Sequence, residues 1–293
     1  MTQYPEGRIS IRLVAGSSRP RHAELSSTRP LSAARVFEGK TVAQTLRVLP
    51  VLYRVCATAQ GAAAAAAVES ARRLTVSTAD QFARDMLVMI ETWREHMLRV
   101  LTSWPEASGS KQDPTAIADV FRLARETPAT IYPASDAFTP GGGRLALDTD
   151  ALPNRLDALL RLSATSVFGI PPAEWLALDN LTAAERWASS SRGTAADFVR
   201  YVLDQGWADA GRARVRAMPP LEPQELAARM TAGDVDDFVA RPRWHGEVLE
   251  TGAYARAAAH PLVAAARRAH GDALLARTFA RLVEVATLPG RLG

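Results

Sequence analysis

Hydrophobic residues along most of the chain recur every three or four positions, which is the spacing of one face of an α-helix. This spacing predicts a helix that begins at Thr41 and continues into the alanine run at 62–67, with a bend or break at Pro50. A second helix is predicted to follow Thr78 and to end before Pro105. Its methionine-rich stripe is typical of a packed core, because methionine fills irregular gaps between helices. The stripe contains Phe82, Met86, Met89, Ile90, Trp93, Met97 and Leu101.

The first residues follow a different pattern. Ile9, Ile11 and Leu13 alternate with polar residues, which predicts a half-buried β-strand, and a second short strand is predicted near Ala23 to Ser26. The second half of the chain returns to helical spacing. Helices are predicted there at 151–162, 182–189, 194–203, 223–230 and 253–286, with Pro261 as a break in the last.

These patterns predict a mainly α fold, a helical bundle with a small N-terminal β element. We expect a single domain over residues 1–293, with loops at 106–114 and 133–143 as the candidate internal boundaries. The length of 293 residues and the hydrophobic content of 47% suffice for a sizeable core.

The amino-acid composition limits the kinds of site and partner expected for this chain. The single cysteine, Cys56, excludes an internal disulfide and any all-cysteine iron-sulfur or structural zinc site. The sequence has no apolar run of about eighteen residues and no signal-type start, so we expect a cytoplasmic protein without membrane insertion. The net charge of +4 comes from arginines scattered among acidic residues without aromatic interleaving, so nucleic acid is not an expected partner.

Common catalytic motifs are missing from the sequence. It contains no phosphate loop, no nucleophile elbow and no His-Glu-x-x-His pair, and Gly141 to Gly143 is not followed by the lysine that a phosphate loop needs. His245, His260 and His270 have irregular separations, which favours surface or capping roles over metal binding.

The segment from Arg35 to Ala71 resembles the first metal-binding region of nickel-iron hydrogenase large subunits. In that family a Phe-Glu pair and a Gly-basic pair precede a helix that ends in Arg-x-Cys-x-x-Cys, and an alanine-rich helix with Ala-x-x-x-Glu follows. Here Ala59 stands where the family has its second cysteine, and Ala63 where it has a histidine. The matching residues are Phe37, Glu38, Gly39, Lys40, Arg54, Cys56, Ala65 and Glu69.

A second segment near the other end is similar to another large-subunit motif, a Pro-Arg-aromatic group followed by Glu-x-Gly-x-x-Ala-Arg. Its residues here are Pro242, Arg243, Trp244, Gly246, Glu250, Gly252, Ala255 and Arg256. A weaker similarity lies at Glu6, which matches a family glutamate that lies near a magnesium ion, although Arg8 replaces the histidine of that motif.

The missing residues matter as much as the matches. A hydrogenase holds nickel and iron with four thiolates, because soft sulfur ligands suit these metals, and this chain has one thiol and no C-terminal Asp-Pro-Cys-x-x-Cys. This combination resembles the hydrogenase expression/formation proteins of the HupK family, also called HoxV. The resemblance implies a reduced large-subunit-like fold without enzymatic activity. It implies a scaffold or chaperone in nickel-iron hydrogenase maturation that holds the iron centre, Fe(CN)2CO, and helps to transfer it to the large subunit.

The resemblance also implies the partners and the site. The expected partners are the hydrogenase large subunit and maturation accessory proteins, and neither nickel nor an iron-sulfur cluster is expected. Cys56 is the candidate iron ligand, with Arg54 beside it as a donor to a cyanide nitrogen, and Glu6 is the candidate magnesium ligand. We further expect Cys56 to lie near the segment from Glu250 to Arg256, since the two chain ends meet at the metal site in the resembled family.

Three alternatives stay open at this point. The first is that neither residue belongs to a metal site, with Cys56 as a small core residue and Arg54 as a solvated helix arginine. The chain is also accounted for as a structural or regulatory mimic of the large subunit that binds hydrogenase subunits without metal. A helical enzyme with an unrecognised active site is the third alternative.

Overall fold

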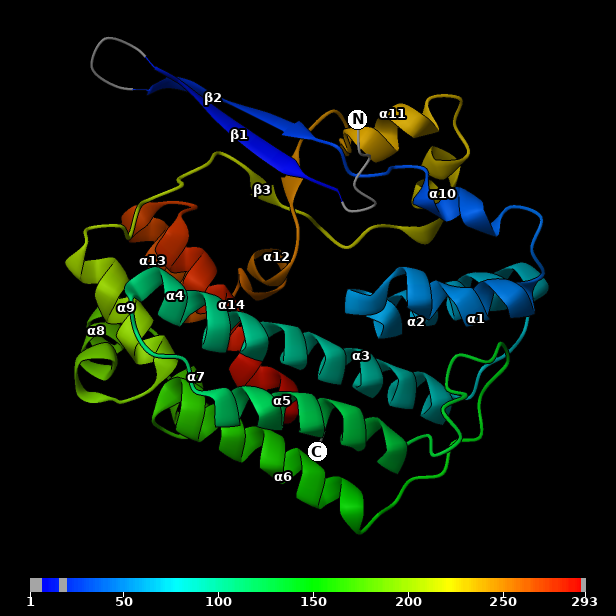
Figure 1. The fold of residues 1–293 in the computed structure, drawn as a ribbon, viewed down its shortest axis with the longest axis horizontal. Helices are drawn as coiled ribbons and strands as arrows, with labels where there is room; N and C mark the ends of the chain where they lie inside the picture. The colour runs from blue at the N-terminus through cyan, green and yellow to red at the C-terminus, as the bar shows by residue number, and fades with distance from the viewer. Residues whose placement is uncertain (1–6, 16–19, 291–293) are drawn as a thin grey trace. The chain divides into compact units, whose positions relative to one another are not determined.

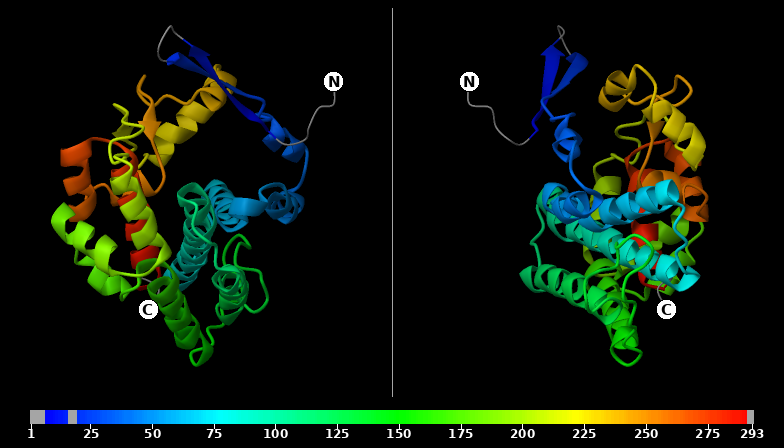
Figure 2. Two further views of the ribbon diagram at one scale, coloured as in Figure 1. Left: turned by 60° about the vertical axis from the view of Figure 1, so that its left-hand side comes forward. Right: turned by 90° about the vertical axis from the view of Figure 1, so that its right-hand side faces the viewer.

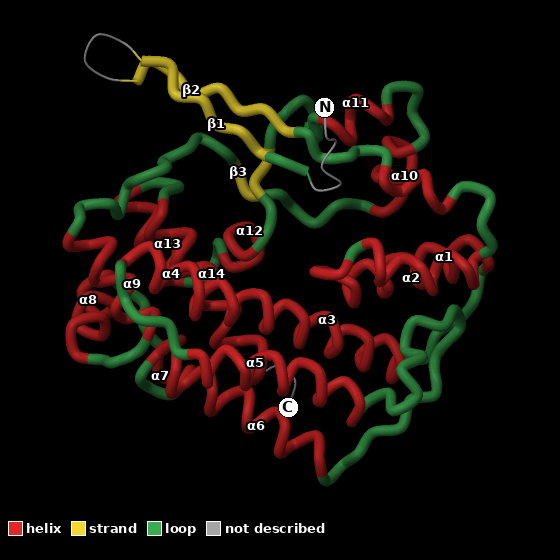
Figure 3. Tube along the Cα trace, in the orientation of Figure 1, coloured by secondary structure: helices red, strands yellow, loops and turns green. Residues whose placement is uncertain are grey.

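The computed structural model describes residues 7–15 and 20–290 and is mainly helical (Figures 1 and 3). This confirms the predicted mainly α fold with a small N-terminal β element, whereas the likeness to a hydrogenase large subunit stays a prediction. The contacts between Cα atoms divide the chain into two compact units. Residues 1–41 and 221–246 form the first unit, and residues 42–220 and 247–293 form the second. Glu6 lies outside the described residues.

The first unit contains the predicted pair of strands. β1 (Ile9–Ala15) pairs antiparallel with β2 (Pro20–Ser27), with Ile11 opposite Leu25. The prediction that the alternating face is half-buried is wrong, because Ile9, Ile11 and Leu13 are all largely exposed. A two-stranded ladder satisfies backbone groups but supplies no second layer to cover an apolar face. The helices of this unit are η1 (Ala33–Phe37), α10 (Pro223–Met230) and α11 (Val235–Ala240).

The second unit is a bundle of helices with one minimal parallel ladder, β3 (Arg216–Ala217) beside β4 (Leu249–Glu250). Its first helices are α1 (Val42–Leu52), η2 (Arg54–Cys56), α2 (Ala57–Arg72), α3 (Thr78–Leu98), the π-helical turn η3 (Arg99–Ser103), α4 (Trp104–Ser108), α5 (Pro114–Glu126) and η4 (Thr127–Thr130). The remaining helices are α6 (Ala151–Leu162), the π-helical turn η5 (Ser163–Phe168), α7 (Pro172–Leu176), α8 (Leu181–Ser190), α9 (Thr194–Asp204), α12 (Ala253–Ala257), α13 (Pro261–His270) and α14 (Leu274–Gly290).

The core of the second unit surrounds α14, which packs against α3, α6, α7, α9, α12 and α13 and is drawn in red in Figure 2. Phe279, Leu282 and Val285 of α14 are buried. The predicted stripe of α3 is buried as well, except that Phe82 is exposed and Met89 is partly buried. α1 and α2 lie beside each other, and α2 packs on α3 (Figure 1).

The prolines agree with the predicted breaks only in part. Pro50 lies inside α1, and the chain breaks two residues later, after Leu52, where the direction changes by 103°. α3 ends at Leu98, before Pro105 as predicted, but η3 and α4 follow it directly, and Pro105 lies in the first turn of α4, where no amide donor is needed. The predicted helix at 253–286 is interrupted twice, before Pro261 and around Gly271.

α5 was not predicted, although its start carries a clear signal. Asp113 accepts hydrogen bonds from the amides of Thr115 and Ala116, and Pro114 occupies the first helical position. Aspartate followed by proline favours a helix start, because both satisfy the first turn.

Within the ranges 7–15 and 20–290, no single helix is long and apolar enough to cross a membrane, while the bent pair of α1 and residues 54–72 meets those criteria together.

Candidate functional site

Cys56 lies on a tight turn between two helices. It is the last residue of η2 and the N-cap of α2, and its side chain is partly buried. The amide of Gln60, one helical turn later, lies 3.9 Å from the Cys56 sulfur. The turn therefore leaves Cys56 partly exposed, with an amide donor near its sulfur.

Helix α3 holds the backbone of this turn. Glu91, which is 6% exposed, accepts hydrogen bonds from the amides of Thr58 at 2.8 Å and Ala59 at 2.9 Å with its two carboxylate oxygens. Arg94 donates to the Val55 carbonyl at 2.7 Å. The first amides of a helix lack partners within the helix, and a carboxylate is favourable at this positive end. The position of Cys56 is thus fixed by two side chains from another helix.

Arg54 lies on the same turn, two residues before Cys56, and its side chain is exposed. Within the described part of the chain it forms no hydrogen bond or ion pair. Both predicted side chains of the site are therefore held in place through the backbone, while their own functional groups are not engaged by other charged residues.

The second motif-bearing segment is held differently. Glu250 of β4 binds the guanidinium of Arg277 with both oxygens, at 2.6 Å each. Arg256 of α12 binds Glu284 in the same two-point manner, at 2.5 and 2.8 Å. Gly252, with φ of 91°, supports the sharp entry into α12. The charged side chains of this motif are bound to α14.

A buried hydrogen-bond chain extends from this pair to α3. His96 lies 2.6 Å from Glu284, and Arg281 approaches the other ring nitrogen of His96, Nδ1, at 3.2 Å. Arginine only donates, so Nδ1 is the acceptor and Nε2 carries the proton given to Glu284. Burial raises the pKa of Glu284, but hydrogen bonds from His96 and Arg256 outweigh it and lower that pKa to about 2.

The two motif-bearing segments both attach to α3. Glu91 and Arg94 hold the Cys56 turn. His96 contacts Glu284, the residue that Arg256 also binds. Residues 91 and 96 lie about 7.5 Å apart along a helix axis, on faces that differ by roughly 140°.

Among residues 7–15 and 20–290, no hydrogen bond or ion pair joins Cys56 directly to residues 250–256. Direct proximity of the two segments stays a prediction.

Glu69, the last residue of the first motif, has a structural role. It forms a buried ion pair with Arg84 at 2.9 Å and accepts the Gly141 amide at 2.9 Å. Arg84 also donates to the carbonyls of Ala137 and Thr139. The glycine-rich loop is therefore anchored to α2 and α3 through Glu69.

Comparison with known proteins agrees with the motifs. No protein-family model matches the chain. It is 28% identical over 244 residues to the hydrogenase expression/formation protein HoxV of Cupriavidus necator, which covers 79% of this chain and 56% of that protein. It is 34% identical over 98 residues to the hydrogenase expression/formation protein HupV of Azotobacter chroococcum, which covers 33% of this chain and 28% of that protein.

Both relatives are hydrogenase expression/formation proteins, and these similarities support the HoxV/HupK family. This confirms the resemblance that the sequence motifs indicated. The chain spans about half the length of HoxV and about a quarter of HupV.

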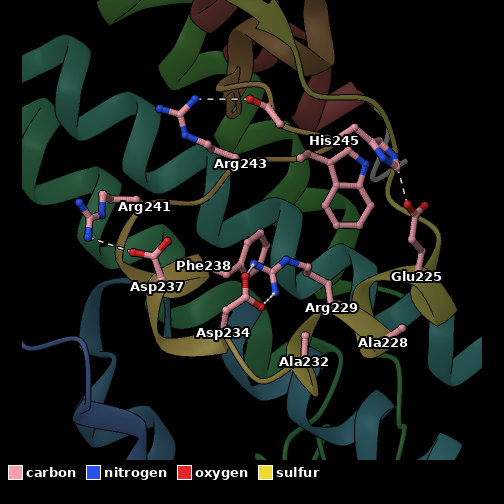
Figure 4. A pocket seen from close by; sticks show the side chains of 12 residues that line it. Glu225, Ala228, Arg229, Ala232, Asp234, Asp237, Phe238, Arg241, Arg243 and His245 are labelled. Carbon is pink, nitrogen blue, oxygen red and sulfur yellow. Dashed lines mark hydrogen bonds and ion pairs between the residues drawn. The ribbon is translucent and has the colours of Figure 1, made fainter.

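The Pro-Arg-Trp part of the second motif lies elsewhere, in the first unit. There Arg243 and His245 line a groove of about 600 Å³ with residues of α10 and α11 (Figure 4). His245 pairs with Glu225 at 3.0 Å, Arg229 with Asp234 at 2.6 Å, and Arg241 with Asp237 at 2.9 Å. Arg229 and Arg241 are thus paired with carboxylates, whereas Arg243 donates to the Gly246 carbonyl at 3.4 Å.

The histidines behave largely as predicted. His260 caps α13, since its Nδ1 accepts the Leu262 amide at 3.3 Å, and burial lowers its pKa. His245 is a surface residue, paired as described above. His96, which no sequence motif indicates, is a histidine that joins a buried network. In the regions that the structure describes, no group of three or more histidine, cysteine, aspartate or glutamate residues is arranged to hold a metal ion.

Proposed function

We propose that this member of the HoxV/HupK family is a non-catalytic assembly scaffold in nickel-iron hydrogenase maturation. It holds the Fe(CN)2CO centre through the Cys56 thiolate, as cargo, before transfer to the large subunit. It acts in the cytoplasm, with the large subunit and maturation accessory proteins as partners. The observation that carries this proposal is the position of the only thiol of the chain, on a turn that Glu91 and Arg94 hold in place.

The chemistry of one thiolate suits temporary holding. Sulfur is a soft ligand that matches iron, and the cargo brings diatomic ligands that fill most other positions. The Gln60 amide lies 3.9 Å from the sulfur, and Arg54 is an exposed N–H donor two residues before Cys56 in the sequence. Such donors suit the nitrogen of a bound cyanide. A centre bound through one protein sulfur is more easily released than one bound through several, which favours its passage to a site with more thiolates.

The single thiol of the chain also argues against hydrogen turnover by the chain itself. Four thiolates hold a nickel-iron centre in the resembled family, and this chain supplies one. We expect no hydrogen-dependent dye reduction by the purified protein above a heat-denatured control.

Complementation of a deletion strain tests the proposal. Hydrogenase activity should be lost on deletion, restored by the unaltered chain, and not restored by Cys56→Ser. Glu185→Gln, a change at an exposed residue of α8, is the matched control and should restore activity fully. Thermal unfolding of both variants shows whether each is folded. A folded Cys56→Ser variant that restores full activity would contradict the proposed role of the thiol.

The second candidate is a mimic of the large subunit that binds hydrogenase subunits without metal. The observation that favours it is that Glu250 and Arg256 of the second motif bind α14, so this motif serves the fold. This candidate predicts that deletion abolishes activity and that Cys56→Ser restores it.

A further inference from the structure

Helix α1 has apolar residues both on the side that packs on α2 and on part of its exposed surface. Its inward face packs on α2 and includes buried Leu49. The outward face exposes Val48, Val51 and Leu52 by 36%, 70% and 40%, and the stripe continues into the turn with Val55 at 66%. Val48, Val51 and Leu52 have the spacing of one helical face, and Val55 lies beyond the bend of 103° that follows α1. Exposed neighbouring apolar side chains of this kind are typical of an interaction surface, so this outward face is suited to a partner.

The charge on this surface has one sign. The sequence from Val42 to Val68 contains no aspartate or glutamate, and its two arginines, Arg47 and Arg54, are exposed. Neither arginine forms a hydrogen bond or ion pair with any residue that the structure describes.

The nearby acidic residues of α3 do not neutralise the two arginines. Glu91 is buried against the start of α2, and Glu95 pairs with Arg94 at 2.7 Å. The surface is therefore an apolar stripe with two uncompensated positive charges.

We propose that the outward face of α1, formed by Arg47, Val48, Val51, Leu52, Arg54 and Val55, is the docking surface for a protein whose facing surface is apolar and rimmed by carboxylates. Apolar contact supplies the affinity, and the arginines select an acidic partner over a basic one. Cys56 follows Val55 directly, so a protein docked here covers the sulfur. The idea that this partner exchanges cargo with Cys56 rests on the proposed function, whereas docking itself requires no metal.

The binding test uses the purified metal-free large subunit of the hydrogenase from the same cells as the probe. Val51→Asp places a charge in the middle of the stripe and should weaken binding at least about tenfold. Phe121→Asp is the matched control, because Phe121 of α5 is also an exposed apolar residue, at 55% against 70% for Val51. The affinity of this variant for the probe should stay within about twofold of that of the unaltered chain. Both sites are exposed, so both variants should unfold at nearly the same temperature as the unaltered chain.

The charge requirement has its own test. Reversing Arg47 and Arg54 together to glutamate should weaken binding, and added salt should weaken binding of the unaltered chain. Binding that is indifferent to Val51→Asp, or no binding of the unaltered chain to the probe, overturns the proposal.

Alkylation of Cys56 gives a second, independent readout, since the chain has one thiol. Bound probe should slow alkylation about tenfold in the unaltered chain and in Phe121→Asp, and not in Val51→Asp at the same probe concentration. Phosphatidylglycerol vesicles should give no protection. Protection by vesicles that Val51→Asp abolishes would identify a membrane surface as the occupant and overturn the proposal. If the chain retains iron at Cys56 but does not bind the probe, the docking surface is overturned and the scaffold role is not. If the chain binds the probe but retains no iron, the scaffold role is overturned and the docking surface is not.

Discussion

The turn at 54–56 and the segment at 250–256 both carry family-like motifs, yet the structure uses them in opposite ways. At the turn, α3 binds backbone groups and leaves the side chains of Arg54 and Cys56 outside the ion-pair network. In the other segment, α14 binds the side chains of Glu250 and Arg256 themselves. A shared motif therefore does not imply a shared role. Substitutions in the first segment should affect function, and substitutions in the second should affect stability.

The largest effect is expected at Glu284. Glu284→Gln removes the charge that both Arg256 and His96 bind in a site only 8% exposed, and should lower the free energy of unfolding by about 2–4 kcal/mol. Chemical denaturation measures this loss, with Glu185→Gln as a control that should stay within about 0.5 kcal/mol. An equal, small effect of both changes would show that the second segment is not held by its ion pairs.

The same residue predicts a pH dependence. The pKa of Glu284 is about 2 in the folded protein against an ordinary value of 4.5, so its stabilising contribution is complete above pH 4.5 and is lost as the pH falls toward 2. The contribution is on the order of 3 kcal/mol. The stability difference between the unaltered chain and Glu284→Gln should therefore shrink as the pH falls from about 5 to about 3, which is the range in which carboxylates titrate. A constant difference across that range would contradict the assignment.

A smaller effect is expected where α3 holds the turn. Glu91→Gln replaces one acceptor oxygen by an amide group that cannot accept the Thr58 or Ala59 hydrogen bond, and should cost about 1–2 kcal/mol. The loosened turn should also change the alkylation rate of Cys56 by several-fold, roughly in proportion to the local opening. Arg94→Lys is the companion change, and it should act in the same direction through Val55. Unchanged alkylation in both variants would show that α3 does not position the thiol.

The sequence carried much of this fold. The bounds of α6 and α10 agree with the predicted helices, although α6 continues without a break into the π-helical turn η5. Pro50 located the break after α1 only to within two residues, since the helix continues to Leu52. The exposure of Ile9 and Leu13 was also missed, because alternation predicts an apolar face but not what covers it.

The site was predictable only in part. The turn with Arg54 and Cys56 followed from the motif, but Glu91 and Arg94 did not, since they lie more than thirty residues later in the chain. The His96 and Glu284 pair is separated by 188 residues, and no local spacing reports such a contact. Tertiary packing alone brings these groups together.

The smallest structural effects are expected at the turn itself. Arg54→Ala removes an exposed side chain without an ion partner and should change stability by no more than about 0.5 kcal/mol. Cys56→Ser should be similarly mild, because serine is a favoured residue at a helix N-cap. Thermal unfolding checks both. A large loss of stability in either variant would place the residue in the core instead of at a functional surface.

Iron content is the most direct test of the central claim that Cys56 holds the cargo. The unaltered chain and Cys56→Ser are purified without oxygen from a host that carries the maturation genes, and each is assayed for iron and for the infrared bands of bound cyanide and carbon monoxide. Oxygen is a harder ligand than sulfur, so serine should not retain the centre. The account predicts iron and diatomic-ligand bands in the unaltered chain and neither in a folded Cys56→Ser variant. Equal iron and unchanged bands in the two proteins would contradict it.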